Sequence, residues 1–127
     1  MISTIAAIAT GGAIGAVARH GVNVLAGNLM GTGFPWGTIT VNILGSFLMG
    51  VLIVKFAHMD GVSQETRAFF TTGFLGAFTT FSTFSLDFSV IWERGDLGMA
   101  LAYMLSSVIL SVLALFAGLW VMRGLVA

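Results

Sequence analysis

The chain has 127 residues, of which 57% are hydrophobic and only 8% are charged, against roughly a quarter charged in an ordinary soluble domain. Its formal net charge is zero and it contains no cysteine. An electrostatic surface for nucleic acid is therefore not indicated, and disulfides, thiolate metal sites and cysteine nucleophiles are excluded.

Four apolar blocks follow one another along the chain, separated by short stretches of turn-forming residues. They cover residues 2–26, 36–56, 66–92 and 97–122. Windows of about 18 or more residues with few or no charges are candidates for membrane-spanning helices. The loops are too short for a second domain. We predict an all-α membrane protein in which residues 1–127 form one domain of four transmembrane helices, the first of them retained and not cleaved as a signal peptide.

The first two blocks contain small residues at helical spacing and two charges, Arg19 and, at the end of the second block, Lys55. Gly11 and Gly15 form one such pair, and Ser46 and Gly50 form another. Small residues let helices approach closely in lipid, so we expect ordinary helix packing, with a subunit interface as the alternative. Arg19 is either a charge in a vestibule or a side chain that snorkels to the membrane surface.

Basic residues near the ends of the blocks give only a weak preference for one orientation. With four spans, Lys55, Arg67 and Arg123 share one side of the membrane, whereas Arg94 and any contribution from Arg19 lie on the other. The positive-inside bias is therefore small. This pattern is compatible with a chain that inserts in both orientations.

The third block contains the most informative stretch, residues 73–85, which mixes glycine, phenylalanine and hydroxyl side chains and has no single apolar face. Its glycines and paired threonines weaken a helix, so we predict that the backbone opens at the centre of this block. Lipid tolerates such an opening only where the freed carbonyl groups are buried in protein or line a cavity. A broken helix near the midplane is a known device for binding ions.

Phe81 and Phe84 are three residues apart and would share one helix face. The edges of their rings carry the positive end of the aromatic quadrupole and can attract an anion. The alternative is that both rings pack in the core. The neighbouring hydroxyl groups weigh against it, because polar groups inside lipid need partners or water.

Other uncharged polar side chains converge on the same region. Asn42 offers an amide, and Tyr103, Ser107 and Ser111 recur at every fourth position of the last block. A serine in a membrane helix often bonds to the preceding turn, so a polar track and simple local bonding are both possible. For Asp87 we expect an interfacial or capping role, with a vestibule charge or a salt bridge as the alternative. Cation pathways often use rings of Asp or Glu, whereas these residues offer amide and hydroxyl donors. This pattern favours an anion over a cation.

Enzymatic chemistry is not indicated. His20 and His58 are far apart, and neither has a second histidine or a carboxylate at metal-ligand spacing. No phosphate-binding glycine pattern is present either. We therefore predict a protein without a catalytic site.

With these residues laid out, the chain resembles the Fluc (CrcB) family of bacterial fluoride channels over essentially its full length. The most specific segment is GFLGAFTTFSTFS, residues 73–85. The run VNILGSF at residues 41–47, the glycine-rich first block with Arg19, and Tyr103 in the last block are also similar to that family.

The resemblance implies an antiparallel, dual-topology homodimer in the bacterial inner membrane, with two pores and a third helix broken at its centre. Fluoride would leave the cytoplasm passively through these pores. The implied pore residues are Asn42, Phe81, Phe84, Ser82 or Thr83, Tyr103, Ser107 and Ser111. The resemblance also implies a structural sodium ion on the dimer axis, held by the backbone carbonyls of Gly76 and Thr79 from both subunits.

Two other functions remain as alternatives. Small multidrug transporters also have four spans, but they rely on a glutamate in their first helix, and the first two blocks here contain no acidic residue. A non-transporting assembly factor would use the glycine pairs as its working surface. Fluoride efflux from liposomes, and its dependence on a proton gradient, separates these functions.

Overall fold

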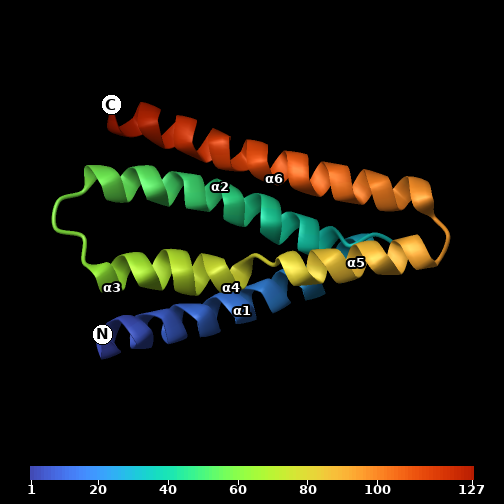
Figure 1. Cartoon of the computed structure of the whole chain (residues 1–127), viewed down its shortest axis with the longest axis horizontal. Coiled ribbons are helices and arrows are strands. Elements are labelled where there is room, and N and C mark those ends of the chain that lie inside the picture. The colour runs from blue at the N-terminus through green and yellow to red at the C-terminus, as the bar shows by residue number, and fades with distance from the viewer.

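The computed structural model describes residues 1–127 and consists of helices without strands (Figure 1). The elements are α1 (Ile2–Met30), α2 (Trp36–His58), α3 (Gln64–Arg67), η1 (Ala68–Leu75), α4 (Gly76–Phe78), α5 (Phe81–Glu93) and α6 (Leu97–Val126). Four stretches are long and apolar enough to cross a membrane, namely α1, α2, the run Gln64–Glu93 and α6. This confirms the prediction of an all-α protein with four spans.

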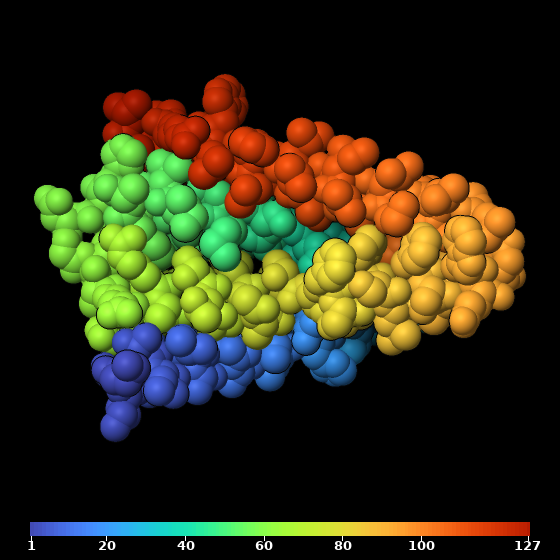
Figure 2. Space-filling model, viewed as in Figure 1, coloured from blue at the N-terminus to red at the C-terminus, as the bar shows by residue number.

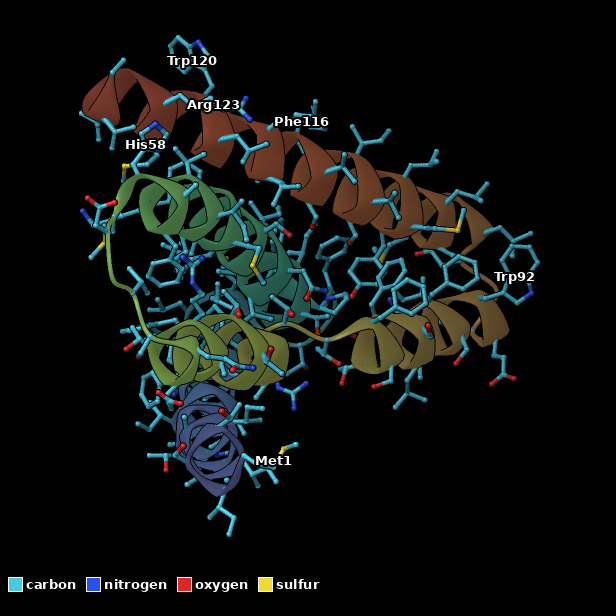
Figure 3. The ribbon with its side chains drawn as sticks, turned by 60° about the vertical axis from the view of Figure 1, so that its left-hand side comes forward. Met1, His58, Trp92, Phe116, Trp120 and Arg123 are labelled. Carbon is cyan, nitrogen blue, oxygen red and sulfur yellow. The ribbon has the colours of Figure 1, made fainter.

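The four spans lie side by side along the long axis of the molecule. Figure 1 shows α2 and the run from α3 to α5 between α1 and α6, with both termini at the same end. In Figure 3, Trp92 lies at the end opposite His58, Trp120 and Arg123. Tryptophans at both ends match the positions of the aromatic belts at the two membrane surfaces.

Glycines bring the helices into close contact. A Cβ atom on Gly11 or Gly15 would collide with backbone carbonyl oxygens of η1, those of Phe69 and Phe74 respectively. On the other side of the bundle, a Cβ atom on Gly50 would collide with the carbonyl oxygen of Leu115 in α6. Such contact between backbones is typical of helix packing in lipid. These three glycines therefore pack helices within one chain, as expected.

The third span is the irregular one. Residues 68–75 form the π-helical segment η1, which the sequence did not predict. Thr79 and Thr80 then have extended backbone angles, with φ −88° and ψ 160° at Thr79 and φ −156° and ψ 124° at Thr80. Figure 1 shows this link as a thin coil between α4 and α5. The irregular backbone lies close to the middle of the span.

Two clusters of buried side chains lie one on each side of this link. Tyr103 and Phe84 belong to the first cluster, with Ile39, Ile91 and Ala100. The second cluster contains Val41, Leu75 and Phe78. The extended residues Thr79 and Thr80 are thus held between two packed regions.

Two arginines form hydrogen bonds that connect the ends of neighbouring spans. Arg94 donates to the carbonyl oxygen of Gly33 at 2.9 Å, which ties the end of α5 to the loop before α2. Arg67 donates to the carbonyl oxygen of Phe56 at 3.3 Å, and its guanidinium carbon lies 5.6 Å from the centre of the Phe56 ring. A cation near the last carbonyl groups of α2 also interacts favourably with the helix dipole.

Candidate functional site

The extended link is fastened to α2 by one asparagine side chain. Oδ1 of Asn42 accepts a hydrogen bond from the backbone N–H of Thr80 at 2.8 Å. Nδ2 of the same side chain donates to the backbone carbonyl of Thr80 at 3.0 Å. The amide of Asn42 therefore pairs with both polar backbone groups of one residue, as a neighbouring strand would.

The two threonines of the link also bind locally. The Thr80 hydroxyl accepts from the backbone N–H of Thr83 at 3.2 Å, which makes Thr80 the N-cap of α5. The Thr79 hydroxyl donates to the carbonyl of Leu75 at 2.9 Å. The methyl group of Thr79 packs against Gly45, where a Cβ atom would collide with it. Residues 79 and 80 are thus held by α2 and by the start of α5.

Beside this link lies a pocket of about 310 Å³. Its lining combines hydroxyl groups, one amide and two aromatic rings with a few aliphatic side chains: Asn42, Ser46, Thr79, Thr80, Phe81, Phe84, Ser107, Val108, Ser111 and Val112. Figure 2 shows the surface hollowed next to the yellow residues that begin α5, with teal α2 visible beneath. We call this cavity the link pocket.

Two hydroxyl groups in the link pocket have no hydrogen-bond partner. Oγ of Ser107 and Oγ of Ser111 are buried and unpaired, and Ser107 is only 4% exposed. Buried polar atoms in proteins almost always have partners, so an unpaired pair at one cavity indicates a site for an ion or water. Ser106, by contrast, donates to the carbonyl of Ala102 at 2.6 Å, the local bonding usual for serine in a helix.

The two phenylalanines of the link pocket differ in burial. Their ring centres are 5.5 Å apart and their planes are inclined at 52°. Phe84 is 7% exposed and packs against Tyr103, whereas Phe81 is 75% exposed. Phe84 therefore forms part of the core as well as of the pocket wall, and only Phe81 is free of other packing constraints.

Tyr103 connects this region to a second polar cavity. Its side chain is fully buried, and its hydroxyl donates to Oδ2 of Asp87 at 3.1 Å. Asp87 lines a cavity of about 300 Å³ near the loop between α1 and α2, together with Thr38 and Thr83. Tyr103 stands one helical turn before Ser107, so a row of polar groups runs from the link pocket toward this cavity.

A third cavity of about 250 Å³ adjoins the link pocket. Gly76 and Thr79 line it, and Ser46, Thr79 and Ser111 line both cavities. No three His, Cys, Asp or Glu side chains come together as potential metal ligands anywhere in the chain. The oxygen atoms at this cavity belong to backbone carbonyls and to the hydroxyl groups of Ser46, Thr79 and Ser111.

The structure brings most of the predicted residues to one place. Asn42, Phe81, Phe84, Ser107 and Ser111 share the link pocket. Ser82 is exposed at the first turn of α5, and its Oγ lies 3.4 Å from Oγ1 of Thr80. Arg19 is partly buried on α1 and lines none of these three cavities.

Sequence reasoning missed two features of the site. Ser46 lines the link pocket one turn after Asn42, and that spacing along α2 was a signal that it shares a face with Asn42. The bond between Tyr103 and Asp87 had no such signal, because the two residues lie on different helices.

Comparison with known proteins matches residues 6–119 to the family model described as CrcB-like protein, Camphor Resistance (CrcB). A protein of Paracoccus denitrificans named "Fluoride-specific ion channel FluC" is 52% identical over 127 residues, which covers both chains completely. Proteins with the same name from Chelativorans sp. and Agrobacterium fabrum are 53% identical over 118 residues and 52% identical over 121 residues. These alignments cover 93% and 95% of this chain, and 94% and 97% of the relatives.

Proposed function

Because this chain belongs to the CrcB family, we propose that it is a fluoride-selective channel that exports fluoride passively from the bacterial cytoplasm across the inner membrane. The observation that carries the proposal is the identity of 52% with a protein named a fluoride-specific ion channel, over every residue of both chains. The family is one of ion channels and not of enzymes.

The link pocket supplies the chemistry that a small anion needs. Fluoride is strongly hydrated, so a pathway must replace its water with hydrogen-bond donors. Ser107 and Ser111 offer hydroxyl groups that no other residue occupies. The edges of Phe81 and Phe84 add positive electrostatic potential without a fixed charge that would hold the ion too tightly. A row of weak sites lets the ion both enter and leave.

Farther along the row, the ion would meet Tyr103 and then the cavity that Thr83 and Asp87 line. The hydroxyl of Tyr103 is engaged with Asp87 and becomes a donor to fluoride only when that bond opens. Ser82, next to the link, would belong to the hydroxyl row, and Arg19 would attract anions to a vestibule.

The working unit in this proposal is an antiparallel, dual-topology homodimer with two pores. The link pocket opens on the face that Figure 2 shows, and both it and the adjoining cavity carry the polar residues Ser46, Thr79 and Ser111. Lipid offers such groups no hydrogen bonds, whereas a second subunit covers them. The interruption at Thr79 and Thr80 is then the broken third helix, enclosed by protein on all sides. The weak charge bias permits opposed insertion.

A sodium ion at the centre of this dimer fits the backbone of the link. Gly76 and Thr79 line the third cavity, and both lie where the regular helical hydrogen bonds stop. Their carbonyl oxygens, with those of the second subunit, would hold the ion. Oxygen ligands suit a hard cation of this kind. The ion would supply a positive charge that joins the two broken helices.

Efflux from liposomes tests the proposed function directly. Purified protein is reconstituted into liposomes loaded with potassium fluoride or potassium chloride, and efflux is followed after valinomycin is added. We expect rapid fluoride efflux, negligible chloride efflux, and no change when an uncoupler removes the proton gradient. Fluoride efflux that requires a proton gradient would point to a coupled transporter. No efflux from protein shown to be folded and dimeric would refute the channel.

Two further measurements test the assembly. A single cysteine introduced at position 127 should be labelled in about half of the molecules when the reagent is added outside sealed vesicles, if both orientations are present. Labelling of all or none would contradict dual topology. Replacement of sodium by N-methylglucamine should lower the melting temperature of the reconstituted dimer, and an unchanged melting temperature would contradict a structural sodium ion.

A further inference from the structure

The hydrogen bonds around the link differ from those of a continuous helix at residues 80–83, and side chains accept from two of these four N–H groups. In an α-helix each N–H donates to the carbonyl four residues earlier, so Thr80 would donate to Gly76 and Thr83 would donate to Thr79. Here Thr80 N–H donates to Asn42 at 2.8 Å, and Thr83 N–H donates to the Thr80 hydroxyl at 3.2 Å. Two side-chain acceptors thus replace two backbone carbonyls.

Because the N–H groups of residues 80–83 make no helical bond, the carbonyl groups of residues 76–79 lose their helical donors, and Gly76 and Thr79 are two of these four residues. Gly76 and Thr79 both line the third cavity. The Thr80 N–H, which would otherwise donate to the Gly76 carbonyl, donates to Asn42. The Thr83 N–H, which would otherwise donate to the Thr79 carbonyl, donates to the Thr80 hydroxyl. Asn42 also holds Thr80 extended, which brings its hydroxyl into the capping position.

The same rearrangement frees N–H groups at the start of α5. The first four N–H groups of a helix, from the N-cap onward, have no partner within the helix. In α5 these belong to residues 80–83, and side chains bind only those of Thr80 and Thr83. The N–H groups of Phe81 and Ser82 remain. They begin a helix of 13 residues beside the link pocket, where the hydroxyl of Ser107 is unpaired and only 4% exposed.

We infer that Asn42 is a positioning residue: by pairing with Thr80, it frees the carbonyls of Gly76 and Thr79 for a cation and aims the N–H groups of Phe81 and Ser82 at the anion pathway. Asn42 thereby acts on both ions through the backbone. This inference rests on the proposed function for the identity of the ions. The pairing of Asn42 with Thr80 does not depend on it.

Amide hydrogen exchange of the reconstituted wild-type protein is the first test. The Thr80 amide should be protected in the absence of fluoride, and Asn42→Ala should raise its exchange rate by about tenfold, the factor that one net hydrogen bond supplies. Asn28→Ala removes an exposed asparagine from α1 and serves as the matched control. Fluoride should shift the amide resonances of Phe81 and Ser82 but not that of Thr80.

The second test uses sodium. The rise in melting temperature that sodium produces in the wild type should disappear in Asn42→Ala and persist in Asn28→Ala. Asn42→Asp keeps an oxygen acceptor for the Thr80 N–H, so it should retain both the protected amide and the sodium response. That variant also decides the question if Asn42→Ala does not fold.

Several results would overturn the inference. One is a Thr80 amide that exchanges in the wild type as fast as amides of the exposed loops. Another is an Asn42→Ala protein with reduced flux but unchanged Thr80 exchange and sodium response, which would make Asn42 a direct ligand of the anion. A third is loss of Thr80 protection in Asn42→Asp. Absence of fluoride flux in a wild type whose Thr80 amide is protected would refute the proposed function and leave the pairing intact.

Discussion

Tyr103 in α6 donates its hydroxyl proton to Asp87 in α5 across 3.1 Å, in a region where Tyr103 is fully buried. This is the polar contact between the two helices that continues the row of hydroxyl groups beyond the link pocket. It also gives the carboxylate of Asp87 a donor, which a charged or polar group inside a membrane requires.

Tyr103→Phe should test this contact with little change in packing, because the ring contacts of Tyr103 with Phe34 and Phe84 do not involve the hydroxyl. Asp87 would lose its donor, so we expect a loss of about 1–3 kcal/mol in stability. Adding Asp87→Asn should recover part of that loss. The measurement is the unfolding free energy in a double-mutant cycle. Additive effects of the two substitutions would show that the contact contributes nothing.

Ser107→Ala and Ser111→Ala should separate conduction from stability. Neither hydroxyl has a partner within the chain, so removing it breaks no internal hydrogen bond and should leave the melting temperature unchanged or slightly higher. Fluoride efflux should fall by about tenfold, as expected when one donor of roughly 1.4 kcal/mol is removed from the pathway. Ser106→Ala is the control, since its hydroxyl is bound to Ala102. Fluoride flux at the wild-type level in all three variants would show that neither Ser107 nor Ser111 takes part in conduction.

Phe81→Ile and Phe84→Ile should both lower fluoride flux, because a branched alkyl group has no positive ring edge. They should differ in stability. Phe84 is 7% exposed, so its replacement should cost about 1–3 kcal/mol through altered core packing, whereas Phe81 is 75% exposed and should cost far less in the isolated subunit. Efflux and thermal unfolding of both variants check this. Flux at the wild-type level in Phe81→Ile would contradict its place in the pore.

Gly50→Ala and Gly118→Ala should destabilise the fold without touching the pathway. A Cβ atom at Gly50 would collide with the carbonyl oxygen of Leu115, and one at Gly118 with that of Phe47. Each should cost about 1–3 kcal/mol, because the two helices must move apart. Gly124→Ala, where the space is open, should have little effect. A dimer of Gly50→Ala as stable as the wild type would argue against this close contact.

Hydropathy was enough to predict the four spans, and local spacing was enough to predict that Phe81 and Phe84, and likewise Ser107 and Ser111, share a helix face. Spacing also predicted that Gly11 and Gly15 would pack helices, because residues four apart share a helix face. These features depend on neighbours along the chain, which a sequence displays directly.

The features that the sequence did not predict depend on residues far apart. Asn42 was expected to offer an amide donor to an ion, yet its carbonyl and one N–H bind Thr80, 38 positions away. The contact of Asp87 with Tyr103 likewise joins two helices. The π-helical turns of η1 have no clear signal in the composition of residues 68–75, and the backbone of η1 contacts Gly11 and Gly15 of α1, which are far away in the sequence.

Both termini lie at the same end of the four spans, because an even number of crossings returns the chain to the side where it began (Figure 1). Two copies joined end to end by a short flexible linker would therefore point the same way in the membrane. A genetic fusion that reproduces an opposed pair would need an extra membrane-crossing segment between the copies. A fusion without that segment would be a constitutively parallel protein, against which the activity of the opposed pair could be compared.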